Sequence, residues 1–344
     1  MPLQVEFRRS ALIAAAVGVA YGLFFRLLFN RHEFEKVFGV MTVGFLFLVP
    51  FAVGYLTVAV GERKGAWPWP ARIFVPWLTS VAALAGALLL AWEGLICIFL
   101  WLPLFILEAT LGALLAVWVG WLLRRRRGGA GQGSAAVFVA LLPLLATPLE
   151  HRLARPNEIR TVHSSVDIAA SPEAVWREIA RVPAIDPSEL RFSLARAIGF
   201  PRPIEATLSH EGIGGVRQAS FAGGVVFVET VTVWEPGERL EFSIAADPNS
   251  IPMRTLDQHV TVGGEFFDVL EGRYRIERLT DRPESGVRLH LSSRHRVSTR
   301  FNVYARLWTD FVMSDIQRSI LQVVGQRSTH RMLERDPSDG SKPL

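Results

Sequence analysis

The chain has 344 residues, of which 50% are hydrophobic, and its formal net charge is +5. Its mean hydropathy of +0.28 excludes an ordinary soluble protein, and its single cysteine, Cys97, excludes an intrachain disulfide and a cysteine metal site. No basic run with interleaved aromatic residues follows residue 150, so we expect no nucleic-acid partner.

The first 150 residues hold the long apolar runs, whereas the rest of the chain has the mixed pattern of a globular domain. A helix needs about 20 apolar residues to cross the hydrocarbon core of a bilayer. Residues 95–103 are too short for that and are expected to form a shallow or re-entrant segment. We predict an all-α, multi-pass transmembrane bundle over residues 1–150, with about five spans at 11–29, 38–60, 73–92, 104–123 and 135–149.

Positively charged residues set the expected orientation, because loops rich in Arg and Lys stay in the cytoplasm. Five spans then place the N-terminus in the cytoplasm and the part after residue 150 outside it, across the inner membrane of a bacterium. If residues 135–149 do not cross, that part is cytoplasmic instead. The clusters on the N-terminal side are Arg8 with Arg9, Arg63 with Lys64 and Arg72, and residues 124–127; Arg31 and Lys36 oppose them.

Three charged residues lie in or at the edges of the predicted spans: Arg26, Glu93 and Glu108. A charge inside a membrane is a candidate functional residue, because burying it in hydrocarbon is costly. We favour a polar contact between helices over a transport role, since the chain shows no inverted repeat.

Residues 160–330 have the pattern of one α+β domain. Ser171 suits the N-cap of a short helix, and Pro172 suits its first helical position. An apolar stripe at three- and four-residue spacing predicts a long amphipathic helix over residues 301–330, with Asp315 and Ser319 on the stripe. The expected strands are 161–169, 204–210, 216–221, 225–234, 240–245, 265–279 and 287–297, a second short helix is expected within 188–198, and a disordered tail is expected at 331–344.

The run Val166-Asp-Ile-Ala-Ala-Ser-Pro-Glu-Ala-Val-Trp176 resembles the opening of the START-like (SRPBCC) superfamily, of the polyketide cyclase/dehydrase and lipid-transport type. The order of the predicted elements is similar as well. The resemblance covers residues 160–330 and implies a helix-grip fold, in which a seven-stranded antiparallel sheet surrounds a long C-terminal helix and leaves an apolar cavity. The whole chain is also similar to uncharacterised bacterial membrane proteins that carry this domain after several spans. The superfamily has no shared catalytic motif, so it implies no catalytic residue.

Strand alternation indicates which residues face that cavity. His295 is expected on the inner face, and so is Asp268 unless a bulge near Gly272 shifts the alternation. His295 with Asp268 or Asp315 could act as a general base with an orienting carboxylate. These residues could equally bind a polar head group or form a buried hydrogen-bonded cluster. Alternation does not decide which face Glu229 occupies. The expected ligand-binding residues are Phe242, Tyr274, Leu291, Ser293, Trp308 and Ser319.

These observations favour a membrane-anchored protein that binds a hydrophobic small molecule, lipid or isoprenoid-like, with residues 246–264 as a flap at the mouth of the cavity. One alternative is a cyclase, dehydratase or hydrolase that uses His295 with Asp268 or Asp315; another is a membrane sensor or interaction protein. We expect no cofactor and no metal, because His295, Asp268 and Glu265 are too few and too loosely placed to bind one.

Overall fold

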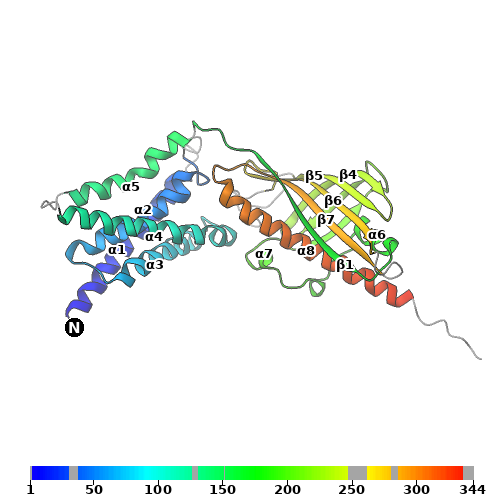
Figure 1. Cartoon of the computed structure of the whole chain (residues 1–344), viewed down its shortest axis with the longest axis horizontal. Helices are drawn as coiled ribbons and strands as arrows, with labels where there is room; N and C mark the ends of the chain where they lie inside the picture. Colours follow the sequence, from blue (N-terminus) through cyan, green and yellow to red (C-terminus); the bar gives the residue numbers. More distant parts are fainter. Residues whose placement is uncertain are drawn as a thin grey trace, which may run out of the picture. The chain divides into compact units, whose positions relative to one another are not determined.

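The computed structural model describes residues 2–30, 38–125, 131–150, 152–246, 262–279 and 286–335 (Figure 1). The chain divides into two compact units, Met1–Arg155 and Pro156–Leu344. Residues 247–261 of the predicted flap lie outside the described residues, as do residues 336–344 of the predicted tail. Residues 331–335, predicted as tail, belong to the last helix.

The first unit is helical, and five of its helices are long and apolar enough to cross a membrane. Residues 95–103, expected as a separate segment, instead form the first turns of one continuous helix that contains Pro103. A continuous helix satisfies its own backbone hydrogen bonds, as an apolar environment requires. The elements are α1 (Pro2–Phe29), the π-helix η1 (Gly44–Leu48), α2 (Val49–Gly61), η2 (Glu62–Lys64), α3 (Trp69–Leu89), α4 (Leu95–Arg125) and α5 (Gly131–Glu150).

Glycines allow α2 and α4 to approach each other closely. A Cβ atom on Gly54 would lie 2.0 Å from the Ala109 carbonyl oxygen, and one on Gly112 would lie 1.9 Å from that of Phe51. Small residues at a helix interface let the backbones come together, and packing of this kind drives helix association in membranes.

Two carboxylates of the helical unit, Glu93 and Glu150, contact an arginine or the backbone. Arg26 forms an ion pair with Glu93 and donates to the Trp92 carbonyl, so two of the three charges predicted in or beside the spans meet. The Glu150 carboxylate accepts hydrogen bonds from the backbone N–H groups of Val43 and Gly44, at 3.1 and 3.0 Å. These N–H groups lie at a helix start, where a helix leaves donors without internal partners.

The second unit is a seven-stranded antiparallel sheet with a long C-terminal helix, which confirms the predicted helix-grip architecture. The strand order across the sheet is β1-β7-β6-β5-β4-β3-β2. Its elements are β1 (Glu158–Ile168), α6 (Pro172–Ala180), η3 (Pro187–Glu189), α7 (Leu194–Ala197), β2 (Pro203–Leu208), β3 (Val216–Phe221), η4 (Ala222–Gly224), β4 (Val225–Glu235), β5 (Arg239–Ala246), β6 (Phe267–Arg278), β7 (Val287–Val297) and α8 (Asn302–Arg335).

The sheet and the helices α6 and α8 bury a common apolar core. Ser171 caps α6 as predicted, because its side chain accepts a hydrogen bond from the Ala174 N–H group. Core side chains come from the strands, from α6 and from the C-terminal half of α8; they include Ile168, Trp176, Leu240, Phe242, Tyr274, Leu289, Leu291, Leu321 and Val324.

A bulge in β6 reverses the expected placement of Asp268. The pairing of β6 with β7 shifts between Val269 and Glu271, so Val269 pairs with His295 on the inner face and Asp268 pairs with Arg296. The prediction that Asp268 lies on the inner face is therefore wrong, and a bulge near Gly272, which the prediction named as its exception, is the reason. The extra residue of a bulge moves every side chain before it to the opposite face of the strand.

Gly272 follows this bulge and gives space to an aromatic ring. It pairs with Phe242 on β5 and with Ser293 on β7. A Cβ atom on Gly272 would lie 2.4 Å from Phe242 Cε2, and Phe242 is buried. The Phe242 ring therefore occupies space that is free only because residue 272 has no side chain.

We expect Gly272→Ala to destabilise the second unit by about 1–3 kcal/mol, because the new methyl group forces the buried Phe242 ring to move. The measurement is chemical unfolding of the full chain in detergent. Gly325→Ala is the matched control: its Cβ would lie 3.6 Å from Ile168, an ordinary contact, and alanine favours the helix. Equal stability of the two variants would contradict the steric role of Gly272.

Candidate functional site

Helix α8 is attached to the inner face of the sheet through Gln317. Its amide nitrogen donates to the Val162 carbonyl of β1, at 3.1 Å, and to the Ser293 hydroxyl of β7, at 2.9 Å. Gln317 is buried, and no partner of its oxygen Oε1 is present in the part of the chain that the structure describes. A single carboxamide therefore links the helix to two neighbouring strands and leaves one acceptor unpaired.

His295 lies on the inner face, as predicted, and is fully buried at 0% exposure. Its ring packs near that of Phe267, with centroids 5.6 Å apart. Neither ring nitrogen has a hydrogen-bond partner within the described ranges. Burial lowers the pKa of His295, and the nearby Asp310 carboxylate opposes part of that change. The imidazole is therefore held in its neutral form at neutral pH.

The carboxylate beside His295 is that of Asp310, in place of the predicted Asp268 or Asp315. Its Oδ1 lies 3.6 Å from His295 Nε2, which is beyond hydrogen-bond distance. Arg160 of β1 holds it with two nitrogens, at 2.9 and 2.6 Å, and also bonds Glu158. The guanidinium therefore fixes the carboxylate beside the buried imidazole.

A second charged pair lies on the inner face further across the sheet. Arg217 of β3 and Glu229 of β4 are register partners, and their side chains meet at 2.8 Å. Both are buried, with residue exposures of 2% and 7%. Burial raises the pKa of Glu229, and the Arg217 charge opposes part of that rise. This result places Glu229 on the inner face, which alternation alone left undecided.

Apolar and aromatic side chains surround this pair. The Arg217 guanidinium lies over the Phe242 ring, 4.9 Å from its centroid, in a cation–π arrangement. Burial raises the pKa of the Tyr274 phenol to about 12, so that group stays protonated and can donate a hydrogen bond. The pair thus presents charge and hydrogen-bonding atoms within an otherwise apolar surface.

Several buried polar atoms of the second unit have no hydrogen-bond partner among the described residues. Buried polar atoms in native proteins are nearly always paired, so a group of unpaired atoms needs an explanation. They include the two ring nitrogens of His295, Ser164 Oγ, Arg217 Nε and Gln317 Oε1.

The other predicted site residues have different positions. Asp315 accepts hydrogen bonds from the Ser193 hydroxyl and the Ala195 N–H group, and so attaches the segment around α7 to the helix rather than approaching His295. Trp308 is half-buried and contacts Phe311 edge to face. Ser319 is half-buried. Phe242, Tyr274, Leu291 and Ser293 are buried on the inner face.

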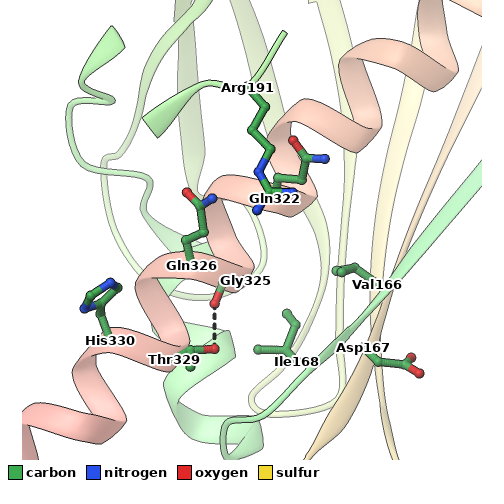
Figure 2. Close-up of a pocket in the computed structure, with 9 residues that line it drawn as sticks. All are labelled: Val166, Asp167, Ile168, Arg191, Gln322, Gly325, Gln326, Thr329 and His330. Carbon is green, nitrogen blue, oxygen red and sulfur yellow. Dashed lines mark hydrogen bonds between the residues drawn. The ribbon is translucent and has the colours of Figure 1, made fainter. Parts of the chain in front are cut away.

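A separate open groove of about 390 Å³ lies between β1 and the C-terminal half of α8. Figure 2 shows polar side chains of Arg191, Gln322, Gln326 and His330 along it, together with the apolar side chains of Val166 and Ile168 from β1. Neither His295 nor Arg217 lines this groove. The two buried clusters and the groove are therefore distinct features of the unit.

No protein-family model matches the sequence, and no curated protein is significantly similar to it. Solved structures match the second half of the chain. A protein of Nitrosospira multiformis is 17% identical, covering 51% of this chain and 99% of that one, with a TM-score of 0.30. Norcoclaurine synthase from Thalictrum flavum, in complex with dopamine and hydroxybenzaldehyde, is 10% identical over 53% and 91%, with a TM-score of 0.32. Ara h 8.0201 is 9% identical over 49% and 98%, with a TM-score of 0.31. Scores this low support no statement about function.

We expect Arg217→Met and Glu229→Leu each to destabilise the protein by about 3–5 kcal/mol, because each leaves an unpaired buried charge. The double variant should lose much less than the sum, since it replaces the pair with apolar groups of similar volume. Chemical unfolding of the four full-length proteins in detergent measures this coupling. Additive losses would show that the two side chains do not act as a pair.

Proposed function

We propose that this chain is a membrane-anchored binding protein that holds a hydrophobic ligand bearing a polar group between α8 and the sheet. The five apolar helices would fix the protein in the bilayer. The second unit, which we call the grip unit, would bind a lipid or isoprenoid-like molecule. The proposed contacts with the hydrocarbon part are Phe242, Tyr274, Leu291 and Trp308, with Ser293 and Ser319 at its polar edge.

The observation that carries this proposal is the set of unpaired polar atoms on the apolar inner face. A buried donor or acceptor without a partner costs about 1–3 kcal/mol. Arg217 Nε, Gln317 Oε1 and the His295 nitrogens lack protein partners in the described ranges. A bound molecule that supplies hydrogen bonds at these atoms, and apolar surface elsewhere, removes that cost and gives the ligand its orientation.

Acid–base catalysis is the second candidate, favoured by one observation. His295 is neutral and lies beside Asp310, the geometry of a general base with a carboxylate that stabilises its protonated form. Hydrogen bonds of this kind are often long in a free enzyme and shorten with substrate. A loss of turnover in His295→Asn, with ligand binding unchanged, would favour this function over binding alone.

Native mass spectrometry of the full chain, released from mild detergent, tests the binding function. We expect a co-purified amphipathic molecule in the wild-type protein and its loss in the Arg217→Met/Glu229→Leu double variant. The matched control is Glu235→Leu/Arg239→Met, which removes an exposed ion pair of the same chemistry and should retain the molecule. A wild-type protein that carries no molecule and takes up none from a lipid extract would contradict the proposal.

We further propose that the N-terminus is cytoplasmic and the grip unit is extracytoplasmic, because Arg and Lys concentrate in the loops on the N-terminal side. An alkaline phosphatase fused after Arg155 should then be active, as should one fused in the first outer loop, and one fused after Arg125 should be inactive. Activity after Arg125 together with inactivity after Arg155 would show the reverse orientation.

A further inference from the structure

The N-terminal half of α8 carries an apolar stripe that faces solvent. Val303, Leu307 and Phe311 are 70%, 63% and 36% exposed. Residues four apart lie on the same side of a helix, so these three form one continuous line. Trp308, which is half-buried, contacts Phe311 edge to face beside this line. The stripe borders the side of α8 that carries Asp310 and Gln317, and its own three side chains point to solvent.

The stripe continues onto a neighbouring segment. One turn beyond Phe311, Asp315 binds the Ser193 hydroxyl and the Ala195 N–H group. This contact fixes Phe192 and Leu194, which are 85% and 45% exposed, beside the helix. We call the set Val303, Leu307, Phe311, Leu194 and Phe192 the apolar surface. Exposed apolar patches of this kind mark interaction sites in proteins.

Positive charge borders this surface. Arg191 precedes Phe192, and Arg318 lies on the same side of α8 two turns beyond Phe311; both are exposed. Of the two acidic side chains in this part of α8, Asp310 pairs with Arg160, whereas Asp315 accepts hydrogen bonds from the neutral Ser193 hydroxyl and Ala195 N–H group. The surface therefore combines an apolar centre with two exposed arginines at its border, a composition that suits an interfacial membrane-binding face.

The position of the surface along the chain favours a bilayer over a protein as its partner. The Asn302 amide donates to the Pro156 carbonyl, at 3.4 Å, so α8 begins where the second unit begins. Glu150 ends α5, and the chain between Glu150 and Pro156 reaches about 20 Å when extended. If α5 spans the membrane, the start of the apolar surface is tethered within that distance of the lipid headgroups.

We propose that the apolar surface binds the headgroup region of an anionic bilayer. This inference rests on the proposed membrane anchoring. The apolar side chains insert at the boundary of the hydrocarbon, and Arg191 and Arg318 contact lipid phosphates. Such docking would hold the grip unit at the lipid surface from which an amphipathic ligand is drawn.

Spin-label accessibility in the full chain tests the docking. In a Cys97→Ala background, labels are placed at Leu307→Cys, at Val228→Cys and at Leu114→Cys, and the protein is reconstituted in nanodiscs with and without phosphatidylglycerol. Val228 is an exposed apolar residue on the sheet face opposite α8, and Leu114 is exposed on α4. With phosphatidylglycerol we expect the Leu307 label to shift toward collision with oxygen and away from a water-soluble nickel reagent, and the Val228 label to remain in water.

The outcomes separate this inference from the membrane anchoring. If the Leu307 label is as accessible to nickel as the Val228 label while the Leu114 label lies in lipid, the docking is overturned and the anchoring stands. A Leu307 label shielded from both reagents shows a protein partner, such as a second copy, and also overturns it. A Leu114 label in water contradicts the anchoring itself.

Charge reversal gives a second readout. Arg191→Glu/Arg318→Glu should abolish the effect of phosphatidylglycerol on the Leu307 label, because it removes the cations beside the apolar surface. The control Arg273→Glu/Arg275→Glu makes the same change at exposed residues of β6 and should keep the wild-type response. An unchanged response in the Arg191→Glu/Arg318→Glu protein would contradict the proposed phosphate contacts.

Discussion

The attachment of α8 across the sheet is the constraint on which the second unit depends. Asn302 fixes the start of the helix, Asp310 and Gln317 bind β1 and β7 along it, and Arg327 pairs with Glu189 near its far end. Because the helix is fixed at several points, polar groups beneath it cannot turn toward water. Their hydrogen bonds must come from the protein or from a molecule held in the grip.

Each unit buries a pair of opposite charges, and in both pairs each charge offsets part of the cost of burying the other. Arg26 with Glu93 connects α1 to the turn before α4, and Arg217 with Glu229 connects β3 to β4. A buried ion pair seldom adds stability over apolar groups, yet breaking one is costly. Such pairs therefore constrain which helices and strands stay together. In the second unit the pair also leaves Arg217 Nε unpaired within the described chain, which makes it a recognition feature as well as a structural one.

The sequence predicted the elements well, because periodicity and turn residues are local properties. The five apolar helices, the seven strands, the Ser171 cap and the inward position of His295 all follow from them. The bulge in β6 depends on the pairing with β7, and so the face occupied by Asp268 was predicted wrongly. Helix α8 packs against the sheet on one side and near α6 and α7 on another, so a single stripe could not identify Asp310 and Gln317. Asp310, Met313, Gln317, Leu321 and Val324 follow one another at three- and four-residue steps. This second periodic set is the sequence signal of the other packed side of the helix.

Strand β1 is both an edge of the sheet and the first element after α5. Tension transmitted along the link from the helices of the first unit would therefore act first on the outermost residue pair of the β1–β7 ladder, Glu158 with Val297. Two residues further in, Arg160 connects that strand to α8 through Asp310. The ion pair beside His295 therefore also resists detachment of the edge strand. If β1 separated from the sheet, Arg160 would leave Asp310 and the charge around the buried imidazole would change.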